Sequence, residues 1–278
     1  MALNWLQTFV YGIVSGLTEI LPVSAQAHRL MLRKLFGTQA VSNLTLLMIH
    51  IGILAAVYMC CQSQILRITR AVKLKRIPKK RRRRPLDVVS LLDYSLLKTM
   101  ALPMILAFIF MYKLKVLENN HIVVAVFLLV NGIILYIPQY FPGSNRDSRT
   151  LSRLQGLLIG LGGALSALPG ISGIGAIFSV ASICGVERSY AFNMSLLLEL
   201  LLLTALIVMD VLVIVTEGIA GMSFLLIIQS LAGAVIAFGT TILAVRILRK
   251  VSAEYGLTPF SFYCWAAALF SLMLTMFA

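Results

Sequence analysis

The stretch GIVSGLTEILPVSAQAHRLML, residues 12–32, carries a carboxylate, hydroxyl groups and an imidazole within an otherwise apolar segment. Glu19 and His28 lie on either side of Pro22, which ends one helix and allows another to begin. Ionisable groups inside a membrane are costly, so they usually face a cavity or a partner. The stretch therefore predicts a broken helix whose polar side chains line a functional site. A buried structural pair of Glu19 and His28 is the alternative.

The composition of the whole chain favours a membrane protein. Of its 278 residues 60% are hydrophobic and 12% are charged, and the mean hydropathy is +0.95. A soluble domain of this length cannot bury so much apolar surface. Helices that span a bilayer need about 20 mostly apolar residues. Six segments meet that condition: 43–61, 94–112, 121–141, 190–216, 222–246 and 259–277.

Two further apolar regions, 3–36 and 154–183, are interrupted by glycine and proline. Broken helices at membrane depth are tolerated only where they are buried in protein or line a cavity. We therefore predict that both regions are re-entrant helical hairpins. They resemble each other at an offset of 148 residues, which pairs Leu6 with Leu154, Gln7 with Gln155, Gly12 with Gly160, Leu17 with Leu165 and Ser24 with Ser172.

The predicted fold is an all-α integral membrane protein with about six transmembrane helices and two re-entrant hairpins related as an inverted repeat. We expect a single membrane domain over residues 1–278, with one repeat covering about 1–141 and the other about 154–278. Inverted repeats with interrupted helices place a binding site where the two halves meet. Chance similarity between two segments rich in glycine and leucine is the alternative.

A block of positive charge sets the expected orientation. Eleven of the 24 Lys and Arg residues lie between Arg67 and Arg84, where no Asp or Glu occurs. We predict a basic cytoplasmic loop over 62–93 that contacts anionic membrane lipids rather than nucleic acid. In that orientation hairpin 154–183 opens toward the cytoplasm and hairpin 3–36 toward the outer face.

Polar groups beside the two breaks suit an anion. Helix N-termini present free N–H groups, and Ser24 and Gln26 add a hydroxyl and an amide. Ser172 is expected to face them from the second hairpin, where Gly170 lets the backbone approach a ligand closely. Arg29 falls on the outer side, where a phosphate ligand would explain the positive charge.

The first stretch resembles a signature of the undecaprenyl-diphosphatase family of the bacitracin-resistance type, which carries two glutamates four residues apart, an S-S pair and a histidine. The segment ALPGISGIGAIFSVASICGVERSYA resembles the second signature of that family, P-G-x-S-R-S. LMIHIGILAAV and GLTPFSFY resemble further family segments, so the similarity covers most of the chain.

The resemblance implies a phosphatase in the bacterial cytoplasmic membrane, with its pocket facing the outer side. Such an enzyme converts undecaprenyl diphosphate to undecaprenyl phosphate, which recycles the lipid carrier of peptidoglycan biosynthesis. It implies a divalent cation, Mg²⁺ or Ca²⁺, when the enzyme is active. A homodimer is left open.

The expected residue roles come partly from the resemblance and partly from the residues themselves, and they divide into three groups. Glu19, His28 and Ser24 are the expected catalytic residues, and Glu19 is also the expected metal ligand. Expected substrate-binding residues are Ser172, Gly170, Gln26 and Arg29.

Several signature positions differ from the family pattern. Ser15, Ala25 and Gly173 stand where the family has its first glutamate, second serine and arginine. Glu199, inside span 190–216, is a candidate second carboxylate for a metal if it faces the cavity, and a neutral helix–helix hydrogen bond is the alternative. Two functions therefore stay open: an active diphosphatase, or a degenerate relative that binds or translocates a polyprenyl phosphate without hydrolysis.

Overall fold

The structure is a computed structural model that describes residues 4–37, 41–82, 84–141, 145–219 and 222–277. These residues form helices throughout, with one isolated bridge between Arg146 and Val186 and no strand in the described ranges. The α-helices are α1 (Trp5–Ile20), α2 (Ala25–Leu35), α3 (Asn43–Lys75), α4 (Val88–Leu114), α5 (His121–Tyr136), α6 (Arg153–Ala164), α7 (Gly173–Ile183), α8 (Arg188–Glu217), α9 (Phe224–Glu254) and α10 (Thr258–Phe277). Short 3₁₀ helices are η1 (Lys79–Arg81), η2 (Lys115–Asn119), η3 (Ile137–Tyr140) and η4 (Leu165–Ala167).

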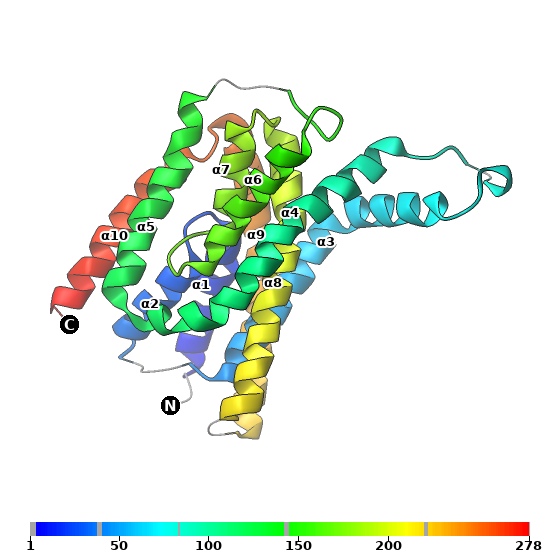
Figure 1. The fold of residues 1–278 in the computed structure, drawn as a ribbon. Helices are drawn as coiled ribbons and strands as arrows, with labels where there is room; N and C mark the ends of the chain where they lie inside the picture. The colour runs from blue at the N-terminus through cyan, green and yellow to red at the C-terminus, as the bar shows by residue number, and fades with distance from the viewer. Residues whose placement is uncertain (1–3, 38–40, 83, 142–144, 220–221, 278) are drawn as a thin grey trace.

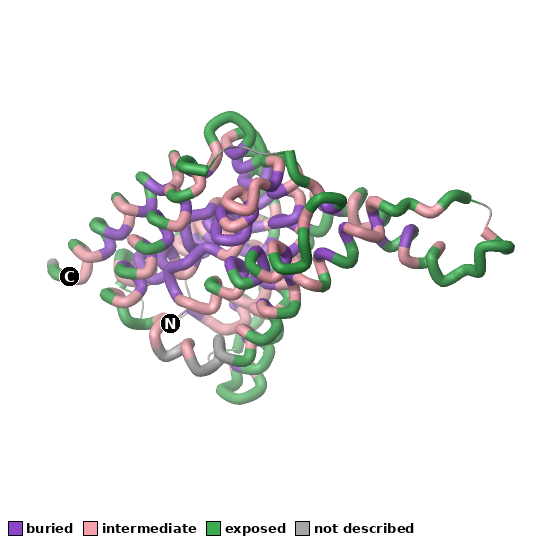
Figure 2. The backbone as a smooth tube through the Cα atoms, turned by 45° about the horizontal axis from the view of Figure 1, so that its top comes forward, coloured by how far each residue is buried: buried purple, intermediate pink, exposed green. Residues whose placement is uncertain are grey.

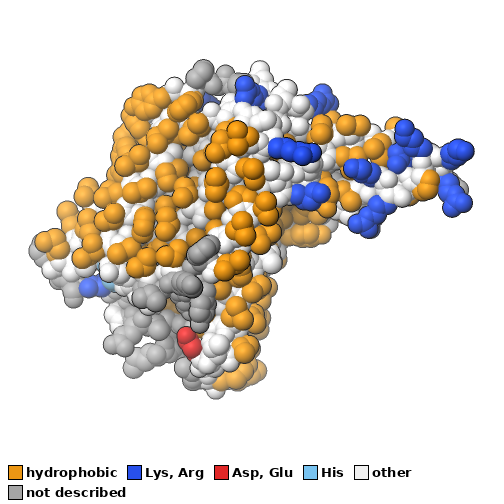
Figure 3. Space-filling model, in the orientation of Figure 1, with side chains coloured by type: hydrophobic (Ala, Val, Ile, Leu, Met, Phe, Trp, Pro, Cys, Tyr) orange, Lys and Arg blue, Asp and Glu red, His pale blue; other side chains and the backbone are white. Residues whose placement is uncertain are grey.

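The predicted all-α membrane fold is confirmed. In the described part of the chain, six helices are long and apolar enough to cross a membrane, namely α3, α4, α5 with η3, α8, α9 and α10. Hydrophobic side chains cover much of the face of the bundle seen in Figure 3. Large exposed hydrophobic residues include Ile133 on α5 and Phe270 on α10. Apolar surface of this extent suits contact with lipid.

The prediction of a loop over 62–93 is wrong for most of that range. Helix α3 continues to Lys75, and α4 begins at Val88. Arg and Lys are good helix formers, and α3 meets no proline until Pro78, three residues after it ends. We call residues 62–93 the basic arm, which projects from the bundle at the right of Figure 1 and carries most of the Lys and Arg in Figure 3.

Four helices of the two predicted hairpins are short. Helices α1, α2, α6 and α7 contain 16, 11, 12 and 11 residues, so at 1.5 Å per residue none exceeds about 24 Å. A hydrocarbon core is about 30 Å thick. Figure 1 shows that the hairpin formed by α1 and α2 starts and ends at the lower side of the molecule. The hairpin formed by α6 and α7 starts and ends at the upper side. Their re-entrant insertion into a membrane stays a prediction.

Both hairpins are capped in the same way, at the same offset of 148 residues. Asn4 and Ser152 each form a capping box with the glutamine three residues on. The second helices begin at Ser24 and Ser172, whose hydroxyl oxygens accept from the amides of Ala27 and Gly175. The matched sequence positions therefore have matched structural roles, which supports the repeat, although its boundaries and the single domain stay predictions.

Several packing contacts between the halves follow the same symmetry. Helix α1 lies against α9 and α6 against α4, while α3 packs on α8 and α5 on α10. The paired glycines Gly12 and Gly160 both sit at close helix approaches. A Cβ at Gly12 would lie 3.0 Å from the Gly233 carbonyl oxygen, and one at Gly160 would overlap the Met100 carbonyl oxygen. Buried residues concentrate in the middle of the bundle, where the two hairpins meet (Figure 2).

Candidate functional site

The breaks of the two hairpins meet in the core of the protein. Asn131 of α5 donates from Nδ2 to the Pro22 carbonyl oxygen at 3.0 Å, and its Oδ1 accepts from the Ser172 amide at 3.0 Å. A Cβ at Gly175 would lie 2.7 Å from the Pro22 Cβ, so the second hairpin touches the first directly. One buried amide side chain thus holds both breaks together.

The first break has a strained backbone. Among the described residues, Ser24 is the only non-glycine residue with a positive φ, at 63°. Such conformations cost about 1–3 kcal/mol and persist where the surroundings hold them, often at functional sites. Ser24 is also the N-cap of α2, so the strain lies where that helix presents its free amides to the core.

A small polar cavity of about 50 Å³ lies between the two breaks, and we call it the inner cavity. Both N-cap serines line it, as do polar side chains from α1, α2, η4 and α8. These residues are Thr18, Glu19, Ser24, Gln26, Arg29, Ser166, Ser172 and Glu199. Most of the residues predicted for the site, Ser172 among them, are therefore found around a single cavity.

Arg29 is the positive centre of the inner cavity. Its Nη1 donates to Glu19 Oε2 at 2.9 Å, and the two side chains are only 11% and 9% exposed. Gly173, which stands in the position of the signature arginine, lines the same cavity. The first hairpin thus supplies to this cavity, through Arg29, the guanidinium that the second hairpin lacks.

Glu199 faces the inner cavity from α8. Its side chain is buried, and its Oε2 atom has no hydrogen-bond partner in the described part of the structure. Glu19 lines the same cavity. Glu199 therefore meets the condition set for it as a second carboxylate beside a metal, namely that it faces the cavity. Ser15, in the position of the first signature glutamate, is buried, and its hydroxyl has no hydrogen-bond partner among the described residues. It does not line the inner cavity.

His28 lies differently from the expectation. Its Nδ1 is 2.8 Å from the Ser24 carbonyl oxygen, and its Nε2 is 2.8 Å from the Tyr263 hydroxyl on α10, on which the ring also stacks. A carbonyl oxygen only accepts, so Nδ1 carries the proton and Nε2 accepts from the tyrosine. His28 is absent from the lining of the inner cavity, so in this conformation it braces α2 against α10.

Gly170 also has a backbone role. Its φ is +105°, and a Cβ there would lie 2.5 Å from the Val124 carbonyl oxygen. Only glycine fits such a turn closely against α5. Gly170 shapes the break that places Ser172 and does not itself line the inner cavity.

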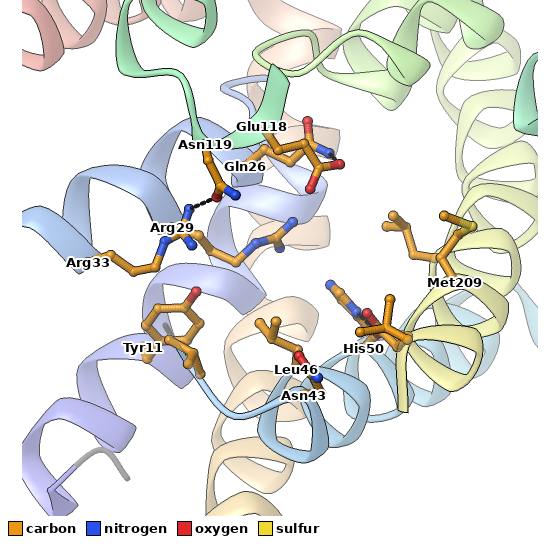
Figure 4. Close-up of a pocket in the computed structure, with 14 residues that line it drawn as sticks. Tyr11, Gln26, Arg29, Arg33, Asn43, Leu46, His50, Glu118, Asn119 and Met209 are labelled. Atoms are coloured by element: carbon orange, nitrogen blue, oxygen red, sulfur yellow. Dashed lines mark hydrogen bonds and ion pairs between the residues drawn. The ribbon is translucent and has the colours of Figure 1, made fainter. Parts of the chain in front are cut away.

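A second cavity of about 220 Å³, the outer cavity, adjoins the inner one and shares Gln26 and Arg29 with it (Figure 4). Gln26 donates from Nε2 to Glu118 Oε1 at 3.1 Å, and Arg33 donates to Asn119 at 3.1 Å. The polar residues that line this cavity are Tyr11, Gln26, Arg29, Arg33, Asn43, His50, Glu118, Asn119 and Asp210.

The sequence analysis missed the pair formed by His50 and Asp210. His50 Nδ1 lies 2.5 Å from Asp210 Oδ2, which joins α3 to α8 at the edge of the outer cavity. The available signal was the presence of two ionisable residues within the apolar spans 43–61 and 190–216. Their separation of 160 residues hid the contact.

Comparisons with known proteins agree over nearly the whole chain. The sequence model of the bacitracin resistance protein BacA family matches residues 8–270. A Methanobrevibacter smithii protein named undecaprenyl-diphosphatase is 28% identical over 275 residues, which cover 96% of each chain. Proteins of the same name from Korarchaeum cryptofilum and Thermosipho melanesiensis are 26% and 27% identical, over 93% and 95% of this chain and 94% and 97% of their own.

Proposed function

Because the chain belongs to the bacitracin resistance protein BacA family, we propose that it is an undecaprenyl-diphosphatase. It removes the terminal phosphate of undecaprenyl diphosphate and returns undecaprenyl phosphate to the lipid-carrier cycle of cell-wall synthesis. One observation carries this proposal beyond the family: Arg29, Glu19, Ser24 and Ser172 surround a single buried cavity between the two hairpin breaks.

The inner cavity is suited to a phosphate group. Helices α2 and α7 both begin at it, so two sets of free N–H groups and the positive ends of two helix dipoles face the same space. Arg29 adds a full positive charge with a planar fork that matches phosphate oxygens. These groups would hold the diphosphate in the orientation that the reaction requires.

Phosphoryl transfer depends on positioning and charge stabilisation, and a single arginine contributes about 10³–10⁵ in rate where it has been measured. Arg29 is the residue that supplies this charge in our proposal. Glu19 holds the guanidinium in place, because their ion pair is almost fully buried. The serine hydroxyls of Ser24 and Ser172 hydrogen-bond phosphate oxygens.

A divalent cation fits the donor set of the inner cavity. Within the described residues Glu199 has a buried oxygen without a hydrogen-bond partner, and Glu19 lines the same space. Magnesium is commonly held by one or two carboxylates together with substrate phosphates. We propose that Glu19 and Glu199 hold Mg²⁺ or Ca²⁺, which when bound would neutralise charge on the diphosphate.

Six candidate spans make this a multi-pass membrane protein, and we propose the cytoplasmic membrane with the cavities open to the outer face. Helix α3 supports this orientation. Asn43 at its start lines the outer cavity, and Lys75 at its end lies in the basic arm. The 33 residues between these ends extend about 50 Å at 1.5 Å per residue, so an arm in the cytoplasm leaves the cavities outside.

The basic arm is proposed to bind anionic lipid headgroups. Lys79, Lys80, Arg81 and Arg84 are exposed on it, and each basic residue near an anionic surface contributes about 1 kcal/mol. Native mass spectrometry after extraction from phosphatidylglycerol-containing membranes should detect fewer retained anionic lipids when these four residues are replaced by glutamine. Unchanged retention would contradict this role.

Phosphate release from farnesyl or undecaprenyl diphosphate by the purified protein, with Mg²⁺ or Ca²⁺, tests the function. We expect release that Glu19→Ala abolishes and that Glu217→Ala, an exposed glutamate at the end of α8, leaves unchanged. Measurable lipid-phosphate binding without release would overturn hydrolysis in favour of a carrier.

A further inference from the structure

The His50–Asp210 pair is oriented like the histidine and carboxylate of a catalytic dyad. A carboxylate only accepts hydrogen bonds, so the short contact between Asp210 Oδ2 and His50 Nδ1 fixes the proton on Nδ1. The other ring nitrogen, Nε2, is buried and has no hydrogen-bond partner in the described part of the chain. The His50 side chain is 4% exposed.

The free nitrogen belongs to a ring that lines the outer cavity. Figure 4 shows His50 at one wall of this cavity and the Arg29 side chain extending into it from the opposite wall. Arg29 also lines the inner cavity, so an anion bound by its guanidinium lies at the junction of the two spaces. A buried polar atom without a partner is unfavourable, and a phosphate oxygen or a water bound there would provide the missing partner.

The two buried histidines near the site differ in this respect. Both ring nitrogens of His28 are engaged, by Ser24 and by Tyr263. In His50, Nδ1 is engaged by Asp210, and Nε2 has no hydrogen-bond partner among the residues that the structure describes. Of the two, only His50 can exchange a proton with a ligand without first breaking a hydrogen bond.

Resting on the function proposed above, we propose that His50 is the proton-transfer residue of the reaction and that Asp210 positions it. His50 Nε2 accepts a proton from the attacking water as the water oxygen bonds to the terminal phosphorus. The bridging P–O bond breaks, and its electron pair leaves with the lipid phosphate. The imidazolium, stabilised by Asp210, then releases its proton to the phosphate product or to solvent.

The surroundings of the pair suit this role. Arg29, Arg33 and Glu118 are the other charged groups that line the outer cavity, from α2 and η2. The arginines attract the phosphate, and Asp210 favours the imidazolium that forms during the step. General acid–base catalysis of this kind contributes about 10²–10⁴ in rate.

The test compares His50→Asn with His121→Asn. The asparagine at 50 can keep a donor toward Asp210 and lacks only the free nitrogen, while His121 lines neither cavity. We expect His50→Asn to lower kcat for farnesyl diphosphate by about 100-fold or more, with a KM within threefold. His121→Asn should behave as the wild type does.

Asp210→Asn provides a second test that leaves His50 in place. We expect a lower kcat with a KM within threefold of normal, because the imidazolium loses its carboxylate partner. If the wild type releases phosphate and the kcat of His50→Asn stays within threefold of the wild-type value, the role of His50 is overturned and the proposed function is not. If His50→Asn fails to fold, an unchanged kcat in Asp210→Asn overturns that role. Absence of release by the wild type would overturn the proposed function together with this step.

Discussion

Arg29 and Glu19 face each other across the break at Pro22, with Nη1 of the arginine 2.9 Å from Oε2 of the glutamate. The two residues come from different helices, α2 and α1, so the ion pair forms only when the chain reverses direction at the break. It also places positive charge in the cavity that Gly173 lines without contributing a side chain. The first hairpin thereby supplies an arginine that the second one lacks.

Replacement of Arg29 by lysine should lower kcat for farnesyl diphosphate by about 10²–10³, since lysine keeps the charge and loses the planar fork. Phosphate release at saturating substrate measures this effect. Arg33→Lys, on the same helix and lining the outer cavity only, is the matched control and should lose less than tenfold. Equal losses in both variants would contradict the assignment of Arg29 to the reacting phosphate.

Asn131→Ala should destabilise the fold, because the buried Pro22 carbonyl and Ser172 amide both lose their Asn131 partner. Each unsatisfied buried group costs about 1–3 kcal/mol. The midpoint of thermal unfolding in detergent should fall by several degrees. The exposed Asn145→Ala should leave it unchanged, and an unchanged midpoint for Asn131→Ala would show that Asn131 does not join the two breaks.

Single cysteines placed just before and just after each hairpin should label in two groups. With the native cysteines replaced, Asn4→Cys and Gly37→Cys should react with an impermeant maleimide from the outer face, and Ser152→Cys and Ser189→Cys only from the cytoplasm. All four positions are exposed. A pair labelled from opposite faces would mean that its hairpin crosses the membrane and is not re-entrant.

Glu187 should contribute stability that depends on pH. Burial acts to raise the pKa of Glu187, but the hydrogen bonds that its carboxylate accepts from Ser189 and Tyr190 outweigh this effect, and the pKa is lowered. A depressed folded-state pKa stabilises the protein above the unfolded value of about 4.3. The contribution is lost as pH falls through the folded value.

Glu187→Gln should therefore unfold at lower temperature than the wild type at pH 7, by an amount that corresponds to about 0.3–1 kcal/mol for charge at a helix N-terminus. The two proteins should converge below pH 4. Thermal melts from pH 3 to pH 7 measure this difference, with the exposed Glu254→Gln as control. A constant difference at all pH values would indicate that the charge of Glu187 has no part in capping α8.

The sequence by itself determined which segments cross the bilayer and where two of them break. Apolar length and proline or glycine position are local properties, so the six spans and the breaks at Pro22 and Gly170 could be predicted. The offset that pairs Ser24 with Ser172 was also visible in the sequence, because both helices begin with the same N-cap residue. The prediction of a loop over 62–93 was wrong because the helix propensity of its Lys and Arg residues extends α3 past the expected end.

Tertiary structure alone decided which polar side chains share a cavity. The rotation of each helix about its axis and its choice of neighbour depend on packing against residues far away in the chain. That packing turns His28 toward Tyr263, pairs Arg29 with Glu19 at the cavity that Gly173 lines, and joins His50 to Asp210. No local pattern encodes these three contacts, because each forms between separate segments whose pairing only the folded bundle fixes.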